Sequence, residues 1–211
     1  MLENKYKVIY DETSKLFPNA RCELNYKNLF ELLVSVVLSA QTTDQNVNKV
    51  TPVLFEKYPD SYTLGNADYS DVCEIIKSIG LAKNKAKNII NLSRKLFEEK
   101  GGIVPADHAY LVSLPGVGNK TANVILAEGF NLPAMPVDTH ILRISNRLGL
   151  SKSDNPDIVE KDLKNVYPEE LWASVHIKLL FFGRYLCKAK NPNCAICPFK
   201  DNYCTVMNKG I

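Results

Sequence analysis

Helical periodicity runs along almost the whole of this 211-residue chain. Apolar side chains recur at intervals of three and four residues, and no segment shows the strict alternation of a half-buried strand. Residues 26–40, YKNLFELLVSVVLSA, are apolar on nearly all sides, which predicts a buried central helix. The fold class is therefore all-α. Further helices are predicted over residues 42–58, 68–78, 82–99, 107–112, 119–129, 139–148, 156–166 and 171–187.

The composition suits a compact intracellular protein. With 45% hydrophobic residues the chain can bury a full core, and its length allows one or two domains. The N-terminal residues, MLENKYKVIY, carry several charges and lack the apolar run of a signal peptide. No stretch has the apolar length of a membrane span, so we expect no membrane partner. Residues 131–138, NLPAMPVD, contain two prolines and predict an extended crossover, where we place the domain boundary.

Basic residues are concentrated near the C-terminus. The net charge of the chain is only +3, but residues 178–211 carry six Lys or Arg side chains against a single acid, Asp201. Such a stretch predicts an anion-binding surface and points weakly to nucleic acid. A solvated lysine face would have the same composition.

Residues 114–118, LPGVG, predict a tight turn between two helices. Gly116 and Gly118 permit positive φ and let main-chain amides approach a ligand without an intervening Cβ. Successive amides at a turn and a helix start form an anion site, for which a phosphodiester is a natural ligand. A plain helix-connecting turn is the alternative.

A faint internal repeat relates this turn to an earlier one. Residues 78–90, SIGLAKNKAKNII, align without gaps with residues 113–125, SLPGVGNKTANVI. Both segments predict a helix, a tight turn and a second helix, but only the second segment has glycines at both turn positions. Lys85 and Lys120 are equivalent in this alignment and are distinguished by their turns.

Lys120 lies just inside the helix predicted to begin near Asn119. The dipole and the unpaired amides of a helix start disfavour an ammonium, and destabilising the ammonium makes a lysine a better nucleophile. A solvated lysine beside a bound phosphate is the alternative. Asp138 precedes the next periodic run, where an N-cap role would account for it. The helix over residues 119–130 is about 18 Å long, and the extended crossover over residues 131–137 can span up to about 23 Å. If the crossover runs back along that helix, Asp138 reaches Lys120.

Four of the six cysteines are crowded into the segment CKAKNPNCAICPFKDNYC. Cys187, Cys194, Cys197 and Cys204 follow the pattern C-x6-C-x2-C-x6-C. In a reducing compartment such a set points to a metal site rather than to disulfides. The spacing alone slightly favours zinc and leaves an iron–sulfur cluster open.

Three motifs together resemble the endonuclease III family of helix-hairpin-helix DNA glycosylases and abasic-site lyases. They are LPGVGNKTANVIL, VDTHILRISNRLGL and the four clustered cysteines, in the family's order and over essentially the whole chain. The resemblance implies a two-lobed helical fold, with one domain over 22–132 and a second formed by 1–21 and 133–211. It also implies a monomer of the cytoplasm, associated with the nucleoid, that acts on double-stranded DNA containing oxidised pyrimidines or abasic sites.

The same resemblance implies roles for individual residues. Lys120 would attack C1′ of the damaged nucleotide and form a Schiff base, after which β-elimination cleaves the strand. Asp138 would assist the amine and stabilise positive charge on the sugar. Gln41 and Leu81 match the residues that enter the gap left by the flipped nucleotide. Without the resemblance, Gln41 would be an ordinary loop residue and Leu81 a helix C-cap contact.

DNA contact is further implied at Gly116 and Gly118, and a [4Fe-4S] cluster at the four cysteines. The family's usual last interval is five residues, whereas this chain has six, PFKDNY, so Cys204 departs from the pattern. We expect a bulge to absorb the additional residue. The implied cluster is structural and holds a basic loop against phosphates. The lysines of this loop are Lys188, Lys190 and Lys200.

Other interpretations compete with this one. Adenine-mismatch glycosylases resemble the chain in the hairpin and the cysteines but lack lysine at the position of Lys120. Pyrimidine-dimer glycosylases would keep both Lys120 and Asp138, so the sequence allows that substrate class as well. A non-catalytic DNA-binding protein is a third alternative, but it would have no need for the pair of Lys120 and Asp138. A metal-dependent nuclease would need clustered carboxylates near the hairpin, and the sequence offers none that is convincing.

Overall fold

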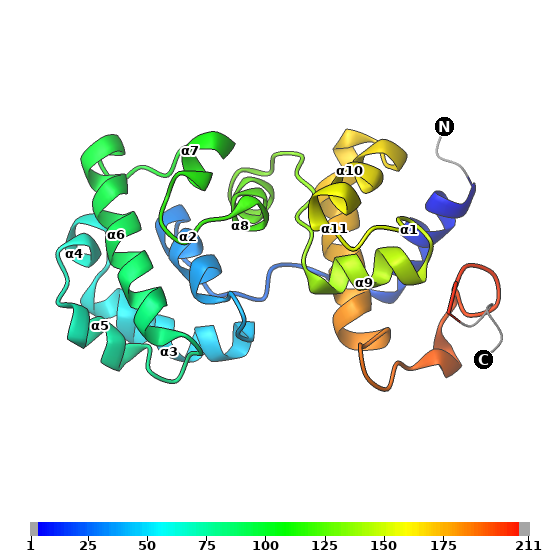
Figure 1. The fold of residues 1–211 in the computed structure, drawn as a ribbon, viewed down its shortest axis with the longest axis horizontal. Coiled ribbons are helices and arrows are strands. Elements are labelled where there is room, and N and C mark those ends of the chain that lie inside the picture. Colours follow the sequence, from blue (N-terminus) through cyan, green and yellow to red (C-terminus); the bar gives the residue numbers. More distant parts are fainter. Residues whose placement is uncertain (1–3, 207–211) are drawn as a thin grey trace. The chain divides into compact units, whose positions relative to one another are not determined.

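The structure, a computed structural model, describes residues 4–206. Every regular element in this part of the chain is a helix, and it contains no strand (Figure 1). The predicted all-α class is therefore confirmed. The chain separates into two compact units, one over Glu23–Phe130 and the other formed by Met1–Cys22 with Asn131–Ile211. We call them the hairpin unit and the cysteine unit after the segments described below.

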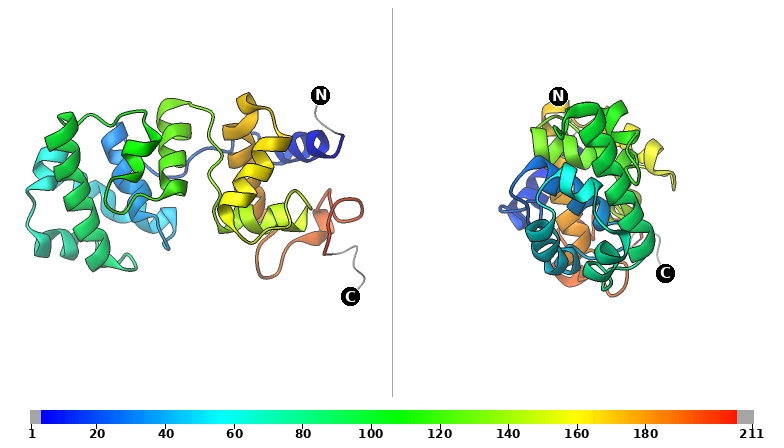
Figure 2. Two further views of the ribbon diagram at one scale, coloured as in Figure 1. Left: turned by 45° about the horizontal axis from the view of Figure 1, so that its top comes forward. Right: turned by 90° about the vertical axis from the view of Figure 1, so that its left-hand side faces the viewer.

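The hairpin unit consists of short and medium helices around α2. Its elements are α2 (Leu29–Leu38), α3 (Asp44–Lys57), α4 (Ser61–Gly65), α5 (Tyr69–Ile75), α6 (Ala82–Lys100), α7 (His108–Val112), α8 (Asn119–Val124) and the π-helix η1 (Ile125–Gly129). Helix α6, of 19 residues, packs against α4 and α5 (Figure 2).

Helix α2 is the buried centre of the hairpin unit, as its apolar sequence predicts. All its residues from Phe30 to Leu38 are buried, and it contacts α3, α6, α8 and η1. Asn28 caps its start by accepting a hydrogen bond from the Glu31 amide at 2.9 Å. The Glu31 carboxylate in turn accepts one from the Lys27 amide at 2.7 Å. The Asn28 side chain thereby pairs one of the amides that a helix start leaves without an intrahelical partner.

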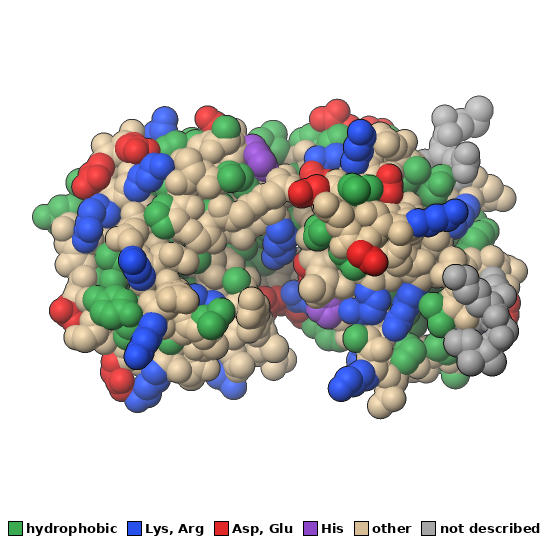
Figure 3. Space-filling model, in the orientation of Figure 1, with side chains coloured by type: hydrophobic (Ala, Val, Ile, Leu, Met, Phe, Trp, Pro, Cys, Tyr) green, Lys and Arg blue, Asp and Glu red, His purple; other side chains and the backbone are tan. Residues whose placement is uncertain are grey.

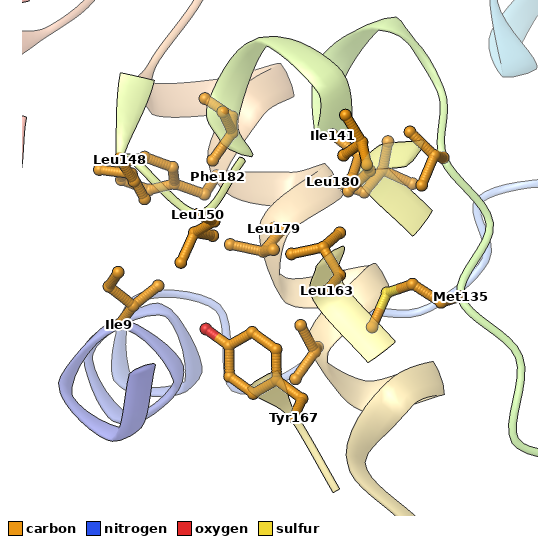
Figure 4. Close-up of a cluster of buried hydrophobic side chains, with 14 of the residues drawn as sticks. Ile9, Met135, Ile141, Leu148, Leu150, Leu163, Tyr167, Leu179, Leu180 and Phe182 are labelled. Carbon is orange, nitrogen blue, oxygen red and sulfur yellow. The ribbon is translucent and has the colours of Figure 1, made fainter. Parts of the chain in front are cut away.

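The cysteine unit joins the N-terminal helix to the last part of the chain. Its elements are α1 (Asn4–Leu16), α9 (Thr139–Arg147), α10 (Pro156–Val166), the 3-10 helix η2 (Glu169–Leu171), α11 (Trp172–Phe181), the π-helix η3 (Phe182–Leu186) and the 3-10 helix η4 (Cys194–Ile196). Ile9 of α1, Ile141 of α9 and Leu179 of α11 meet in one apolar core (Figure 4). Each buried aliphatic side chain stabilises the fold by about 1.5–3 kcal/mol, so this core holds α1 against helices far from it in sequence.

Two of the predicted helices differ from a single regular helix. The segment 119–129 is α8 followed by η1. The segment 171–187 begins at the last residue of η2 and continues as α11 and η3. Short π-helical turns inside helices occur frequently at functional sites. Here η1 continues the helix that begins at the glycine turn, and η3 ends directly before Cys187.

Helix α4 was not predicted, because only five residues separate its caps. The Asp60 carboxylate accepts from the Thr63 amide at 2.8 Å, and the Asp60 amide donates to the Thr63 hydroxyl at 3.3 Å. The crossover over 131–138 forms no regular element, as predicted, and its residues 134–137 are buried. None of the helices within residues 4–206 is long and apolar enough to cross a membrane.

Candidate functional site

The glycine turn connects α7 to α8 in the hairpin unit. Gly116 has a φ of 81°, in the left-handed region, and the Val117 amide closes the turn on the Leu114 carbonyl at 3.1 Å. A Cβ at Gly116 would lie 2.9 Å from Nδ2 of Asn88, which belongs to α6. The position therefore requires glycine for its backbone conformation and for space.

Gly118 has a different role in the same turn. It is the N-cap of α8 with a φ of −100°, and a Cβ there would meet no atom within 4 Å. Gly118 and Asn119 are exposed, so the start of α8 is accessible to an anion that binds helix amides. His108 Nε2 lies 2.9 Å from Asn119 Oδ1, which ties the start of α7 to the first residue of α8.

Lys120 is the second residue of α8 and is half-buried. The prediction that it lies just inside a helix start is confirmed. Its counterpart in the repeat, Lys85, is only 4% exposed, and Lys85 Nζ has no hydrogen-bond partner among the described residues. Burial lowers the pKa of Lys85. The repeat thus contains one lysine near the surface at a helix start and one lysine enclosed in the unit.

The two aligned hairpins share a left-handed residue at the same position. Leu81 has a φ of 62° and is the counterpart of Gly116. A left-handed backbone costs a leucine roughly 1–2 kcal/mol. Leu81 immediately precedes α6 and is 56% exposed, so the helix C-cap contact considered from the sequence is wrong. A strained and exposed apolar side chain is a candidate for a functional role.

Gln41 lies close to the Leu81 turn. It follows the end of α2, is exposed and has a φ of 55°. A Cβ at Gly80 would lie 3.8 Å from the Gln41 carbonyl oxygen. The hairpin unit therefore brings the Gln41 and Leu81 loops together, with both residues exposed and both left-handed.

Asp138 belongs to the cysteine unit, where it caps α9. Its Oδ1 accepts hydrogen bonds from the amides of His140 at 2.9 Å and Ile141 at 2.8 Å. The N-cap role expected from the sequence is confirmed. Both bonds end on Oδ1, so Oδ2 takes no part in the cap. The pairing of Asp138 with Lys120 of the hairpin unit stays a prediction.

Two side chains of α9 that the sequence did not single out extend from this cap toward the cysteines. His140 Nδ1 lies 3.2 Å from Arg143 Nη2, which donates to the Gly183 carbonyl at 2.9 Å and to the Cys187 carbonyl at 3.3 Å. Burial lowers the pKa of His140, and the negative charge of Asp138 acts in the opposite direction. The signal in the sequence was their i, i+3 spacing directly after the cap.

The four clustered cysteines line one cavity of the cysteine unit. Each is half-buried, and the apolar walls of the cavity include Leu148, Phe182 and Leu186. The Cys187 amide donates to the Phe182 carbonyl at 2.8 Å, which continues the turn of η3. Burial raises the pKa of the Cys197 thiol, and the three neighbouring cysteines add to that rise. The sulfur atoms therefore share one environment.

The longer last interval is absorbed in a turn. The amides of Tyr203 and Cys204 both donate to the Phe199 carbonyl, at 3.1 and 2.9 Å. This turn returns Cys204 to the cavity that the other three cysteines line. Within residues 4–206, no group of three or more His, Cys, Asp or Glu side chains is arranged to hold a metal ion.

Basic side chains lie on two segments of the cysteine unit, α9 and the chain that follows η3. On the face shown in Figure 3, Lys and Arg side chains gather over α9 and over the chain that follows η3. Arg143 and Arg147 belong to α9, and Lys188 and Lys190 follow η3. Lys188 and Lys190 are exposed, as an anion-binding surface requires.

Known proteins match this chain over most of its length. Residues 34–169 match the HhH-GPD superfamily of base excision DNA repair proteins. The chain is 50% identical over 191 residues to endonuclease III of Bacillus subtilis, covering 89% of this chain and 86% of that protein. It is 43% identical over 184 residues to endonuclease III of Escherichia coli, covering 87% of each. The chain belongs to the endonuclease III family.

Solved structures agree with membership of the endonuclease III family. A trapped endonuclease III–DNA covalent intermediate superposes with a TM-score of 0.93 at 46% identity and covers 99% of both chains. A thermostable thymine-DNA glycosylase, at 23% identity, shares the fold with a TM-score of 0.86 over 97% of both chains. The predicted class of enzyme, a DNA glycosylase and abasic-site lyase of base excision repair, is confirmed by the family. Membership of this enzyme family rejects the alternative of a non-catalytic DNA-binding protein.

Proposed function

We propose that this endonuclease III family member releases oxidised pyrimidines from double-stranded DNA and cleaves the strand through a Schiff base on Lys120. The observation that carries this proposal is the position of Lys120, two residues after Gly118 at an exposed helix start. A DNA phosphate held by the amides at that helix start leaves the adjoining sugar within reach of the amine. The neutral amine is the nucleophilic form of a lysine.

The reaction begins with attack of the Lys120 amine on C1′ of the damaged nucleotide. The new bond from Nζ to C1′ forms while the glycosidic bond breaks, and the base leaves with the bonding electrons and takes up a proton. Opening of the sugar ring then gives an imine between Nζ and C1′. Removal of a proton from C2′ expels the 3′ phosphate by β-elimination, and water hydrolyses the imine to restore the amine.

Asp138 supplies the carboxylate of this mechanism. It stabilises the positive charge that develops on the sugar and accepts a proton from the attacking amine. Because Oδ1 is engaged by the His140 and Ile141 amides, Oδ2 is the oxygen proposed for this role. The cap fixes the orientation of the carboxylate before substrate binds.

The damaged base must leave the helical stack before the amine can reach its sugar. We assign the filling of the vacated gap to Leu81 and Gln41. Their exposure and left-handed backbones hold both side chains out from the hairpin unit before DNA binds. An apolar wedge in a base step is a general means of kinking a duplex.

The four cysteines are assigned to a [4Fe-4S] cluster. Two observations support this assignment: Cys187, Cys194, Cys197 and Cys204 all line one cavity, and soft thiolate ligands suit iron–sulfur clusters. The cluster when bound supplies a cross-link rather than a step of the reaction. The segment that it fixes presents three lysines to DNA phosphates. They are Lys188, Lys190 and Lys200.

Cysteine replacement tests the ligand set. Cys204→Ser should lower the iron content and the visible absorbance of the purified protein. Cys73→Ser changes a half-buried cysteine of α5 and should leave both unchanged. Full iron content in Cys204→Ser would remove Cys204 from the ligand set. Stoichiometric zinc in the purified wild type would reject the cluster in favour of a zinc site, which the cysteine spacing also allows.

Borohydride trapping tests the central step. The wild-type protein should give a covalent adduct with a duplex containing one abasic site. We also propose that the protein acts as a monomer in the cytoplasm and associates with the nucleoid. Lys120→Ala should give no adduct and retain DNA binding, while Lys87→Ala, an exposed lysine of α6, should behave as wild type. An undiminished adduct with Lys120→Ala would reject Lys120 as the nucleophile.

Substrate range is tested on matched duplexes. Base release should occur from a duplex containing an oxidised pyrimidine such as thymine glycol, and not from an adenine mismatch or a pyrimidine dimer. Release from the dimer at the higher rate would assign the protein to the pyrimidine-dimer class, with the Schiff-base chemistry unchanged.

A further inference from the structure

Arg147, the last residue of α9, holds the beginning of the cysteine segment with its side chain. Its Nη1 donates to the Cys187 sulfur at 3.3 Å and to the Lys188 carbonyl at 2.8 Å. Its Nη2 donates to the Ala189 carbonyl at 3.4 Å. One guanidinium thus fixes three consecutive residues, the first of which is a proposed cluster ligand.

The main chain of the same residue holds the end of the segment. The Arg147 carbonyl accepts hydrogen bonds from the Thr205 amide at 2.8 Å and from the Thr205 hydroxyl at 3.2 Å. Thr205 directly follows Cys204, the ligand whose spacing departs from the family pattern. Arg147 is half-buried and itself lines the cavity of the cysteines.

We propose that Arg147 is a positioning residue for the iron–sulfur cluster, which holds Cys187 and Cys204 in place and stabilises the Cys187 thiolate through a charge-assisted hydrogen bond. This inference rests on the proposed cluster. A hydrogen bond from a guanidinium to a thiolate is stronger than one between neutral groups, and hydrogen bonds to ligand sulfurs are a general determinant of cluster potential.

The direction of the electrostatic effect follows from charge. A cluster held by four thiolates is anionic overall, and its more reduced state carries more negative charge. The positive guanidinium therefore stabilises the reduced state more than the oxidised state, which raises the reduction potential. The neighbouring Arg143 donates to the carbonyl oxygens of Gly183 and Cys187, so its hydrogen bonds support the main chain.

The test compares Arg147→Gln, Arg147→Lys and Lys161→Gln in the full-length protein. Arg147→Gln removes the charge and the fork of donors, and Arg147→Lys keeps the charge without the fork. Lys161→Gln makes the same charge change at an exposed residue of α10. The readouts are iron content after purification, the rate at which the visible absorbance is lost in air, and the midpoint potential of the bound cluster.

Arg147→Gln should lose its cluster several-fold faster than wild type, and the cluster that remains should have a more negative potential. Arg147→Lys should keep a potential closer to wild type but lose the cluster faster, and Lys161→Gln should match wild type in both. A wild-type potential in Arg147→Gln, even at reduced occupancy, would overturn the proposed bond to the thiolate, because a loss of stability alone does not change the potential.

Two outcomes separate this inference from the proposed cluster. A wild-type protein that purifies without iron would reject the cluster itself. A wild type with a full cluster, together with unchanged retention and potential in the Arg147 variants, would reject only the role of Arg147. If Arg147→Gln does not fold, as judged by its thermal melt, Arg147→Lys decides, since wild-type retention in that variant would overturn the positioning role.

Discussion

Leu81 and Gly116 occupy the same position in two aligned hairpins, and both are left-handed, with φ values of 62° and 81°. The two residues adopt the same backbone conformation, but Gly116 has no side chain and Leu81 has a large apolar one. Gly116 offers the conformation at no steric cost and has Asn88 directly behind it. Leu81 accepts strain and presents an exposed apolar side chain. One hairpin is thus suited to gripping a backbone and the other to inserting a side chain.

Replacement of Leu81 by glycine should separate stability from function. Leu81→Gly relieves the left-handed strain, so we expect the free energy of unfolding to rise by up to about 1 kcal/mol while release of an oxidised base slows. Leu81→Ala keeps the strain and should slow base release without the gain in stability. Urea denaturation and single-turnover kinetics measure the two effects. A wild-type rate in both variants would remove Leu81 from the DNA-binding residues.

The two turn glycines should respond differently to alanine. Gly116→Ala forces a Cβ against Asn88 at about 3 Å and a side chain into the left-handed region, which should destabilise the protein by about 1–3 kcal/mol. Gly118→Ala meets open space with an ordinary φ, so its stability should remain within about 0.5 kcal/mol of wild type. We expect Gly118→Ala to weaken DNA binding, as measured by fluorescence anisotropy. Unchanged binding would mean that no phosphate approaches this opening.

Asp138 has a structural role and a proposed chemical role that two substitutions can separate. Asparagine is as good an N-cap as aspartate, so Asp138→Asn should preserve stability and slow base release. Asp138→Ala removes the cap as well and should lower the free energy of unfolding by about 0.5–2 kcal/mol. Thermal melts and single-turnover base release give the two quantities. If Asp138→Asn releases the base at the wild-type rate, Asp138 is only a cap.

Lys85 should make the stability depend on pH in the alkaline range. Burial lowers the pKa of Lys85, so the unfolded chain binds this proton more tightly than the folded protein does. Stability therefore rises as pH increases from the lowered pKa toward the ordinary lysine value, and the full penalty applies at lower pH. Replacing the enclosed amine by Lys85→Met should raise the free energy of unfolding at neutral pH by about 1–3 kcal/mol.

The control for this prediction is Lys83→Met, an exposed lysine of the same helix. It should leave both the stability and its pH dependence unchanged. Denaturation curves across the alkaline range should show the wild type approaching Lys85→Met as pH rises. A constant difference between these two proteins would show that Lys85 has its ordinary pKa in the folded state.

Local patterns predicted the parts of this protein that depend on neighbouring residues. The apolar run of α2, the glycine turn before α8 and the cap at Asp138 were all visible in short segments, because capping and periodicity act over a few residues. The π-helical endings η1 and η3 were not, since a change from i+4 to i+5 bonding leaves almost the same pattern of apolar residues. The short helix α4 was missed for the complementary reason, because five residues are too few to show a period.

The sequence by itself therefore determined the helical class, the position of Lys120 inside a helix start, and the four cysteines as one set. Tertiary structure decided which residues support them. The burial of Lys85, the adjacency of the Gln41 and Leu81 loops, and the hold of Arg147 on both ends of the cysteine segment each join residues far apart in the chain. Contacts of that kind arise from packing of whole helices against each other, and no spacing within a single segment records them.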